Sequence, residues 1–304
     1  MTYTEDTINS VVISVIIPTY NHAEYLRSSI GSVLSQSYGK FEIIVVDDGS
    51  TDNTCEIVEW HCKPSIRYIK QQNRGLAAAR NRGIGECRGD YVAFLDADDR
   101  FLPHHLQVSI DTIREHPHVG FVCGNIRTFG YPDDFYHVHN CAPSPDHYAS
   151  LLKGCFIVNV GACLFRRDVL DKMGGFNEHL RASEDWDLFL RIARHFPIFC
   201  HHEVILEYRR SLGQMSRQCG LMLDTSMRTL RVQYDYAHIK EEYRTAYESG
   251  INDIIKYYGN PAVDEFVTRL RNNDLKVAWD LFLTLLRWYP KGFLRVLHGG
   301  AFRK

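Results

Sequence analysis

Short apolar runs alternate with amphipathic segments through the first 125 residues, and no other feature of the sequence constrains the fold as strongly. Runs rich in β-branched residues are typical of strands that are buried on both faces. They are Val11–Ile17, Phe41–Val46, Ile66–Ile69, Tyr91–Leu95 and Val119–Cys123. Helical spacing between them predicts helices over 23–34, around Ile57–Trp60 and over 75–86. This alternation predicts an α/β fold with a mainly parallel central sheet and helices on both faces.

The pattern changes after the fifth strand. Residues 129–146 are rich in aromatic, Pro, His and Asp residues and predict an irregular insertion. Apolar order returns over 157–166, and the spacing then predicts a helix over Glu184–Arg194 and a last strand over Val204–Tyr208.

Helical spacing dominates the rest of the chain. It begins beyond Ser216 and is broken at Gly259–Pro261, where Gly, Asn and Pro adjoin. We therefore predict an α/β domain over residues 1–215 and a helical C-terminal region over residues 216–304.

The composition excludes several classes of protein. A chain of 304 residues with 45% hydrophobic side chains can bury a substantial core. Its 35 Lys and Arg nearly balance its 37 Asp and Glu, which argues against a nucleic-acid partner. No run approaches the roughly 18 apolar residues of a membrane-spanning helix, and the polar segment Met1–Ser10 does not resemble a secretory signal. We therefore expect a cytoplasmic protein.

Nine cysteines are scattered along the chain and include no Cys-x-x-Cys pair. That spacing gives little support to a structural zinc site or a thioredoxin-type motif. His137, His139 and Cys141 lie close together in the sequence, but no second pair of ligands accompanies them. We therefore expect reduced, mostly buried thiols.

Acidic residues follow two of the predicted strands at the points where these end. The first strand runs into Pro18–Asn21, the second into Asp47–Ser50 and the fourth into Asp96–Asp99. The carboxyl ends of parallel strands meet at one edge of a sheet, where α/β proteins bind ligands. The five carboxylates repel one another there unless they are protonated, hydrogen-bonded or neutralised by a cation. A divalent metal ion, Mn²⁺ or Mg²⁺, completed by phosphate oxygens meets this requirement.

Helix capping is the alternative role for such acids. For Asp52 we favour capping. For Asp96 and Asp98, which directly follow a buried strand, we favour a role with metal and phosphate.

Two common nucleotide-binding loops are missing from the sequence. The first strand–helix turn, Pro18–Ala23, contains no glycine, whereas a dinucleotide site needs Gly-x-Gly-x-x-Gly there. Gly83, Gly85 and Gly89 have the wrong spacing, and no Gly-x-x-x-x-Gly-Lys-Ser/Thr loop occurs. Dehydrogenases and P-loop proteins are therefore excluded.

Six segments, in order and at the expected spacing, make the chain similar to the family 2 glycosyltransferases of the GT-A fold. They are Val15–Asn21, Val45–Asp52, Asn73–Gly83, Phe94–Asp99, Lys172–Phe176 and Ser183–Leu188. The resemblance spans residues 11–217. It implies an inverting transfer from a nucleotide-diphosphate sugar, a UDP-sugar first of all, to a hydroxyl group. It further implies a glycan or lipid-linked acceptor, as in polysaccharide or lipopolysaccharide biosynthesis.

The resemblance also implies roles for residues on the donor side. Asp48 matches the position that accepts a hydrogen bond from the base, Asp96 the position near the ribose and Asp98 the metal ligand. Arg80 matches a basic residue that faces the nucleotide, with Arg74 as a rival. The implied donor site comprises Pro18, Thr19, Tyr20, Asn21, Asp48, Asn73, Gly75, Arg80, Asp96 and Ala97.

On the acceptor side, the resemblance implies that Asp185 is the general base. One carboxylate near the acceptor hydroxyl suffices for an inverting displacement, and crowding and burial would raise its pKa. An acidic first turn that complements a helix dipole explains the same cluster, and both roles can coexist. The implied acceptor side comprises Gly174, Gly175, Glu184 and Trp186.

The chain departs from the family after the last core strand. The family has a histidine there that helps to hold the metal or the diphosphate, and this sequence has Ser211. Serine is a far poorer metal ligand than imidazole. Arg209, Arg210 or Gln214 could bind the diphosphate instead.

The segment Leu275–Lys304 combines six basic residues and one acid with many apolar and aromatic residues. A basic, aromatic-rich helix pair can lie on an anionic membrane surface, here the inner face. A helix packed on the catalytic domain with a solvated basic face explains the same composition, and the sequence leaves both open.

Two other functions remain as alternatives. A nucleotide-sugar-binding pseudoenzyme or scaffold is suggested by Ser211. A nucleotidyltransferase shares the sheet and the acidic ligands, but such enzymes carry a glycine-rich basic loop that Pro18–His22 does not resemble.

Overall fold

The computed structural model describes residues 13–61, 65–130, 137–141, 143–211 and 214–292. It divides into two compact units. Unit 1 takes its residues from 1–147, 156–179 and 188–211, and unit 2 from 148–155, 180–187 and 212–304. Two short internal segments thus belong to the mainly C-terminal unit, and the domain boundary at residue 215 stays a prediction.

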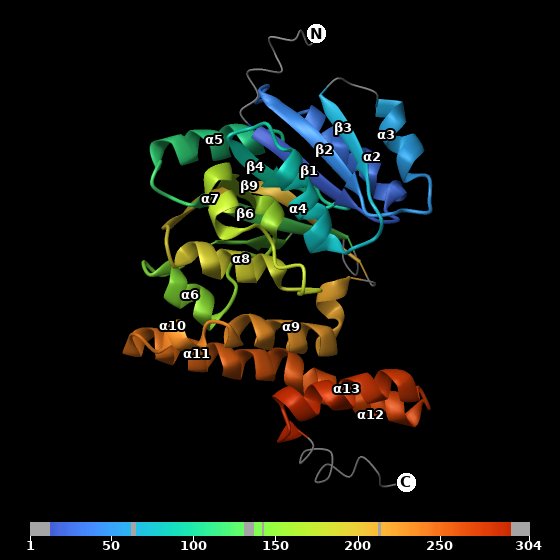
Figure 1. The fold of residues 1–304 in the computed structure, drawn as a ribbon, viewed down its shortest axis with the longest axis vertical. Coiled ribbons are helices and arrows are strands. Elements are labelled where there is room, and N and C mark those ends of the chain that lie inside the picture. The colour runs from blue at the N-terminus through green and yellow to red at the C-terminus, as the bar shows by residue number, and fades with distance from the viewer. Residues whose placement is uncertain (1–12, 62–64, 131–136, 142, 212–213, 293–304) are drawn as a thin grey trace. The chain divides into compact units, whose positions relative to one another are not determined.

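Among the described residues, unit 1 contains a nine-stranded sheet with the order β3-β2-β1-β4-β8-β6-β9-β5, and β7 pairs with β6 (Figure 1). The strands are β1 (Ile13–Thr19), β2 (Phe41–Asp47), β3 (Ile66–Lys70), β4 (Tyr91–Phe94), β5 (Arg100–Phe101), β6 (Phe121–Gly130), β7 (His137–His139), β8 (Cys163–Arg166) and β9 (Ile198–Arg210). The helices that belong to it are α2 (Ala23–Leu34), α3 (Thr54–His61), α4 (Leu76–Glu86), α5 (His105–Glu115) and α7 (Arg167–Met173).

The sheet is parallel in one half and mixed in the other. β1 pairs in parallel with β2 and β4, and β2 with β3. β8 is antiparallel to both β4 and β6, and β5 is antiparallel to β9. β1 to β4 thus form a wholly parallel half, as predicted, and in the mixed half β6 and β9 also pair in parallel. Apolar runs indicate where strands lie in the sequence, but they do not indicate whether a strand runs parallel or antiparallel to its neighbours.

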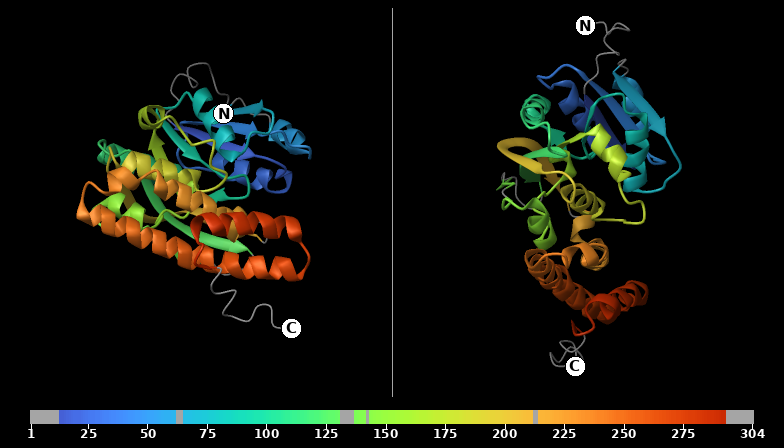
Figure 2. Two further views of the ribbon diagram at one scale, coloured as in Figure 1. Left: turned by 60° about the horizontal axis from the view of Figure 1, so that its bottom comes forward. Right: turned by 60° about the vertical axis from the view of Figure 1, so that its left-hand side comes forward.

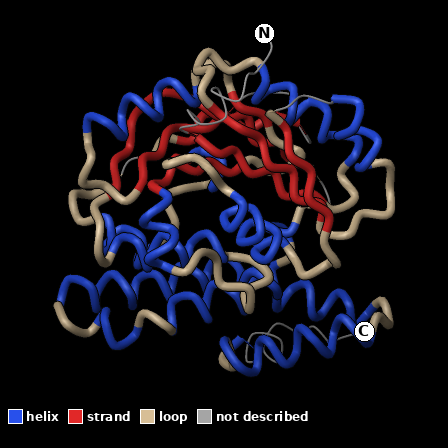
Figure 3. Tube along the Cα trace, turned by 45° about the horizontal axis from the view of Figure 1, so that its top comes forward, coloured by secondary structure: helices blue, strands red, loops and turns tan. Residues whose placement is uncertain are grey.

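Helices cover both faces of the sheet, as predicted (Figure 3). On one face Ile16 of β1 meets α4, where a Cβ on Gly83 would lie 2.4 Å from Ile16 Cγ2. On the other face Val15 and Ile17 belong to a core cluster with apolar residues of α2 and α5. β1 is thus buried on both sides, which explains its unbroken apolar sequence.

Two strands are longer than their apolar runs suggested. β6 continues beyond Cys123 to Gly130, and β9 begins at Ile198. They pair in parallel with a register shift around Asn125. Part of the segment 129–146 that we expected to be irregular is therefore strand, since β7 also lies in it. Polar residues in β6 hid this extension from a pattern based on apolar residues.

Unit 2 is helical in its C-terminal part (Figure 2). Its helices are α9 (Cys219–Arg231), α10 (Tyr234–Ala237), α11 (Glu241–Ile254), α12 (Asn260–Arg271) and α13 (Leu275–Trp288). α9 contacts α11, α12 and α13. α6 (His147–Lys153) packs closely on α11, because a Cβ on Gly250 would lie 2.1 Å from the Leu152 carbonyl oxygen.

The predicted break at Gly259–Pro261 was wrong. A π-helical turn over Ile255–Gly259 leads directly into α12, and Pro261 lies in the first turn of that helix. The backbone keeps helical angles through Gly259 and Asn260, so a wide π-helical turn rather than a break precedes Pro261. Within the described residues, none of the helices combines the length and the apolar character that crossing a bilayer demands.

Candidate active site

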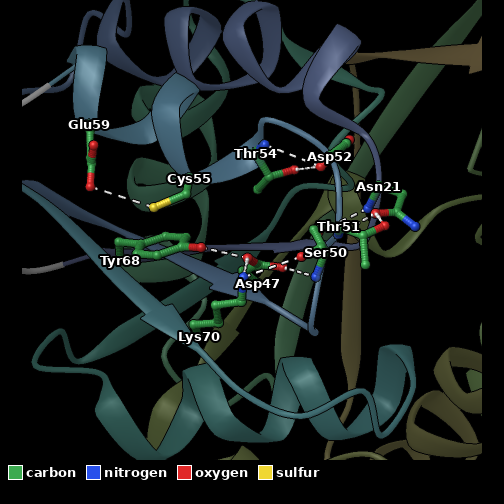
Figure 4. Close-up of polar contacts among 10 residues, drawn as sticks. All are labelled: Asn21, Asp47, Ser50, Thr51, Asp52, Thr54, Cys55, Glu59, Tyr68 and Lys70. Atoms are coloured by element: carbon green, nitrogen blue, oxygen red, sulfur yellow. Dashed lines mark hydrogen bonds and ion pairs between the residues drawn. The ribbon is translucent and has the colours of Figure 1, made fainter.

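The loops that follow β1 and β2 are held together by hydrogen bonds (Figure 4). The Asn21 N–H donates to Ser50 Oγ at 3.0 Å, and the Thr51 N–H donates to Asn21 Oδ1 at 2.8 Å. Asn21 has φ 54°, a left-handed conformation that asparagine adopts more readily than most residues. In this structure Asn21 therefore positions the two loops against each other.

Asp47 is fully buried, and donors of its own unit surround its carboxylate (Figure 4). Oδ1 accepts from the Ser50 N–H at 2.7 Å, and Oδ2 accepts from the Tyr68 hydroxyl at 2.5 Å. Lys70 Nζ lies 3.7 Å from Oδ2. Burial raises the pKa of Asp47, but the hydrogen bonds from Ser50 and Tyr68 and the charge of Lys70 outweigh it, and the pKa is lowered. Asp47 is a structural carboxylate of the β2 end.

Asp48 connects the β2 end to the start of α4. Its Oδ1 accepts from the Arg74 N–H at 2.9 Å and from Gln71 Nε2 at 2.7 Å, and its Oδ2 accepts from the Gly75 N–H at 2.7 Å. Gly75 has φ 93° and directly precedes α4. A carboxylate has about four acceptor positions, so three of them are taken and one remains.

Asp52 caps two helices, which confirms the capping role predicted for it. Its Oδ1 accepts from the Thr54 N–H at 3.2 Å at the start of α3, and its Oδ2 accepts from the Ala23 N–H at 3.0 Å at the start of α2. These N–H groups have no partner within their own helices.

The remaining donor-side residues differ in exposure. Pro18 is buried in β1, and the buried Thr19 hydroxyl has no hydrogen-bond partner among the described residues. The Tyr20 side chain is 48% exposed. Asn73 is exposed, and Ala97 is buried in the core.

Arg80 forms an ion pair with Asp96 directly after β4. Arg80 Nη2 lies 2.7 Å from Asp96 Oδ1, and only 3% of the Arg80 side chain is exposed. The rival residue Arg74 points elsewhere, with its Nη2 2.8 Å from Glu178 Oε2. Of the two arginines, Arg80 is thus the one beside the acidic turn.

Asp98 is half-buried, and no side chain of the described residues donates a hydrogen bond to its carboxylate. Burial and then the neighbouring Asp96 carboxylate raise the pKa of Asp98, while His22 and Arg209 act in the opposite direction. A carboxylate in this position gains from a bound cation. The carboxylate oxygens of the turn are therefore of the kind that a divalent metal prefers, and no described side chain donates to those of Asp98.

Asp99 faces inward instead. Its Oδ2 accepts from Asn159 Nδ2 and its Oδ1 accepts from the Arg209 N–H, both at 2.8 Å. Burial and the neighbouring carboxylates Asp98 and Asp96 raise the pKa of Asp99 well above its usual range. Asp99 anchors the turn to β9 and to the segment before β8.

Arg209 is the basic residue that the tertiary structure brings to this turn. Its Nε donates to the Asp98 carbonyl at 3.0 Å, and its guanidinium stacks between the rings of Tyr25 and Phe129 at 4.6 and 4.5 Å. Ser211 follows it at the end of β9 and is half-buried.

The Gly174–Gly175 turn after α7 has a clear structural role. Both glycines have positive φ, 74° and 70°, and a Cβ on Gly175 would lie 2.4 Å from Asn81 Oδ1. Asn81 bonds both backbone groups of Phe176, and Arg191 donates to the Gly175 carbonyl at 2.7 Å. These contacts hold the turn whether or not an acceptor binds there.

The acidic segment at the start of α8 (Glu184–Ala193) lies in unit 2. Glu184 is buried, and Asp185 is half-buried, with Oδ1 accepting from the Trp186 N–H at 2.7 Å. The Trp186 indole N–H donates to the Leu151 carbonyl at 2.9 Å. The segment is thus rigidly placed within its unit, in the first helical turn as predicted.

The sequence did not indicate Asn159 or His22 as residues of this site, and it indicated Arg209 only as one of several candidates. Asn159 precedes a short 3-10 turn and carries no motif, so nothing in the sequence indicated its bond to Asp99. His22 follows the first motif directly, and its charge acts on Asp98. Arg209 was one of three candidates for diphosphate binding.

The comparisons with known proteins agree with this geometry. The family described as glycosyl transferase family 2 matches residues 14–174, and the glycosyltransferase like family 2 matches residues 146–238. An uncharacterized glycosyltransferase of Rickettsia prowazekii is 32% identical over 222 residues, which are 68% of this chain and 66% of that protein. The chondroitin synthase of Escherichia coli is 27% identical over 214 residues, which are 68% of this chain and 31% of that protein. The chain thus matches less than two thirds of the length of these relatives.

Two solved structures share the fold. S. aureus TarS 1-349 in complex with UDP-GlcNAc has a TM-score of 0.58 and 19% identity, covering 88% of this chain and 89% of that one. The mannosyltransferase PcManGT from Pyrobaculum calidifontis, in complex with GDP-Man and Mn²⁺, has a TM-score of 0.60 and 17% identity, covering 95% of this chain and 79% of that one. The predicted fold class is thereby confirmed.

Proposed function

The chain belongs to glycosyl transferase family 2, and from that membership we propose that it transfers a sugar from a nucleotide-diphosphate donor, a UDP-sugar first of all, to a hydroxyl acceptor with inversion. One observation carries the proposal. The turn after β4 gathers three carboxylates, and Asp98 is the one to which no described side chain donates. Such a site is suited to a cation and a diphosphate.

We assign the donor to the edge of the sheet where β1, β2 and β4 end. The exposed ring of Tyr20 would stack on the base, and the fourth acceptor position of Asp48 would bind the edge of the base. Asp96 would face the ribose, and Arg80 and Arg209 add positive charge beside the acidic turn. A divalent metal, Mn²⁺ or Mg²⁺, would be held by Asp98 and would neutralise charge on the departing diphosphate.

We assign the general base to Asp185. An inverting displacement needs one carboxylate that takes the proton of the acceptor hydroxyl as the oxygen attacks the sugar. The Asp185 carboxylate accepts from the Trp186 N–H, which limits its rotation, and buried Glu184 and Asp187 adjoin it. The acceptor side would include Gly174, Gly175 and Trp186, and we expect a glycan or lipid-linked acceptor.

Thermal unfolding with nucleotides tests the donor site. UDP, GDP and their sugars are added with and without Mn²⁺, because ligands that bind the folded state raise the melting temperature. One nucleotide should stabilise the chain, and Mn²⁺ should increase the effect. Asp98→Asn should abolish the Mn²⁺-dependent part, whereas Asp111→Asn, a surface change on α5, should preserve it. An unchanged melting temperature across the panel would refute the donor assignment.

Asp185→Asn tests the base once a donor is known. The variant should bind the nucleotide as the native chain does but lose transfer by at least about 10²-fold, the lower range for a positioned base. Full activity in this variant would overturn the assignment. Donor binding without transfer or hydrolysis by the native chain would favour the pseudoenzyme instead.

A stripe on α13 supports the membrane contact. Leu275, Trp279, Leu283 and Leu286 are 61%, 60%, 47% and 52% exposed, and their spacing of four, four and three residues places them on one helix face. The opposite face, with Leu281 and Leu285, is buried within unit 2. We propose that the stripe rests on an anionic membrane surface, as at the inner face, where a lipid-linked acceptor would lie.

Sedimentation with vesicles tests this contact. The chain should bind vesicles that contain an anionic lipid more strongly than neutral ones, and Trp279→Ser with Leu283→Ser should lose binding. Val232→Ser, an equally exposed apolar residue outside the stripe, is the matched control. Equal sedimentation of the native chain, the double variant and the control variant would rule out membrane binding through the stripe.

A further inference from the structure

Three cysteines lie side by side in the sheet of unit 1. Cys123 of β6 pairs in register with Cys163 of β8 on one side and with Cys200 of β9 on the other. In-register neighbours on adjacent strands direct their side chains to the same face of a sheet. Residues that are 40 and 77 positions from Cys123 in the chain thus form one row, which no local spacing in the sequence could indicate.

Cys141 completes the cluster from outside the sheet. Its Sγ lies 3.1 Å from Cys123 Sγ and 2.8 Å from Cys200 Sγ, and the Cys123 and Cys200 sulfurs are 3.1 Å apart. The Cys141 N–H donates to Asn125 Oδ1 at 2.8 Å, and Asn125 Nδ2 donates to the His202 carbonyl at 2.6 Å. Asn125 thus holds the backbone of Cys141 in place over β6 and β9.

The geometry of this triangle suits one bound ion. A zinc–thiolate bond is about 2.3 Å long, so sulfurs less than twice that distance apart can reach a common ion. Cys123 and Cys141 are buried, and Cys200 is partly exposed. Among the described residues, these three are the group of His, Cys, Asp and Glu whose ligand atoms converge closely enough to bind a metal together.

We propose that Cys123, Cys141 and Cys200 form a binding site for a thiophilic metal ion, with Zn²⁺ as the ion that fits the ligand set. Thiolate sulfur selects Zn²⁺ or Cu⁺, whereas Mg²⁺ and Mn²⁺ prefer carboxylate oxygen. The chain would then have two metal sites that differ in ligand chemistry: carboxylate oxygens at the acidic turn, and thiolate sulfurs at Cys123, Cys141 and Cys200. The fourth position is open to water.

Metal binding at this site would join three segments that are distant in sequence. Each thiol that becomes a ligand releases its proton to solvent, and the binding free energy adds to that of folding. The site would secure the segment after β7 to β6 and β9. This consequence does not depend on the transferase activity.

Cobalt titration of the reduced full-length chain tests the site. Co²⁺ bound by thiolates produces a sulfur-to-metal charge-transfer absorption in the near ultraviolet, which carboxylate-bound Co²⁺ lacks. One equivalent per chain should produce this absorption, and Zn²⁺ should remove it. Cys200→Ser should lose it, while Cys55→Ser, a cysteine on α3 outside the cluster, and Asp98→Asn should retain it. Absence of the absorption in the native chain, or its retention in Cys200→Ser, would overturn the proposal.

Alkylation of the native chain gives a second test that needs no variant. Zn²⁺ should protect Cys200, the partly exposed thiol of the cluster, from labelling, as read by mass spectrometry of peptides, and should leave Cys55 unprotected. Equal labelling of Cys200 with and without Zn²⁺ would refute the site. A disulfide that joins Cys141 to Cys200 in chain purified with zinc present would do so as well.

Discussion

The loop after β2 and the turn after β4 both place several aspartates at the same edge of the sheet, on either side of β1. In the loop after β2, every carboxylate accepts hydrogen bonds from the chain itself: Asp47 from Ser50 and Tyr68, and Asp48 from the backbone before α4. In the turn after β4, no described side chain donates to the Asp98 carboxylate, and its one hydrogen bond comes from the backbone N–H of Asp98 itself. The pKa of Asp47 is accordingly lowered and that of Asp98 is raised.

The comparison shows that two acidic motifs of similar composition differ in how far their carboxylates are hydrogen-bonded within the chain. Acids that accept several hydrogen bonds hold a loop in place, whereas burial beside Asp96 disfavours the charged form of Asp98, a cost that a bound cation would offset. We therefore expect changes in the turn after β4 to act on function and changes in the loop after β2 to act on stability. The following changes test that division.

The largest effect is expected from Asp98→Asn on transfer. Loss of one preorganised electrostatic contact to the reacting groups lowers the rate by about 10²- to 10³-fold. Initial rates with the identified donor and Mn²⁺ measure it, with Asp111→Asn as the control. A rate within twofold of the native chain would contradict the role of Asp98.

Asp47→Ala should act on stability instead. It leaves the Ser50 N–H and the Tyr68 hydroxyl without their acceptor, and we expect the free energy of unfolding to fall by about 3 kcal/mol. Urea denaturation measures the change. A loss below about 0.5 kcal/mol would mean that this loop is not held by its carboxylate.

Tyr68→Phe should show, through its pH dependence, that the hydrogen bond from Tyr68 to Asp47 stabilises the fold. A carboxyl whose pKa is lowered on folding stabilises above its unfolded pKa, and this contribution is lost as pH falls through the folded pKa. Removing the hydroxyl should cost about 1.5 kcal/mol at neutral pH, and the deficit should shrink as Asp47 becomes protonated. Melting temperatures from neutral pH to about pH 3 test this. A deficit independent of pH would show that the bond does not act through Asp47.

The smallest effect is expected from Asp98→Asn on the stability of the metal-free chain, and its sign is opposite. A carboxyl whose pKa is raised on folding destabilises as pH rises from its unfolded pKa through the folded pKa. In chelator, the variant should therefore melt higher than the native chain at neutral pH, and the difference should vanish near pH 3.5 or below. A lower melting temperature at neutral pH would contradict the comparison.

Much of the fold could be predicted from the sequence. α2 has the predicted bounds, and four strands of the parallel half lie within two residues of their apolar runs. The capping by Asp52 was also predictable, because a cap acts over two residues. The direction of β8 and the length of β6 were not, because pairing partners rather than local residues determine them.

The candidate site divides in the same way. The motifs located the acidic turn, but its donors come from far along the chain: Arg209 is 110 residues from Asp99, and Asn159 is 60. The resemblance put Arg80 before its rival Arg74, and the ion pair with Asp96 shows that Arg80 lies beside the acidic turn. The assignment of Asp185 as base stays a prediction.

By itself, then, the sequence determined the order of strands and helices, the family and the edge of the sheet at which acids collect, since periodicity and capping act over a few neighbouring residues. Only the tertiary structure decided which of these carboxylates accept hydrogen bonds from the chain and which of the scattered cysteines lie in contact. Both outcomes depend on register between strands, which joins residues such as Cys123 and Cys200 across 77 positions of chain. Whether a side chain forms a hydrogen bond or shares a metal ion depends on which distant residue packs against it, and the local sequence does not specify that residue.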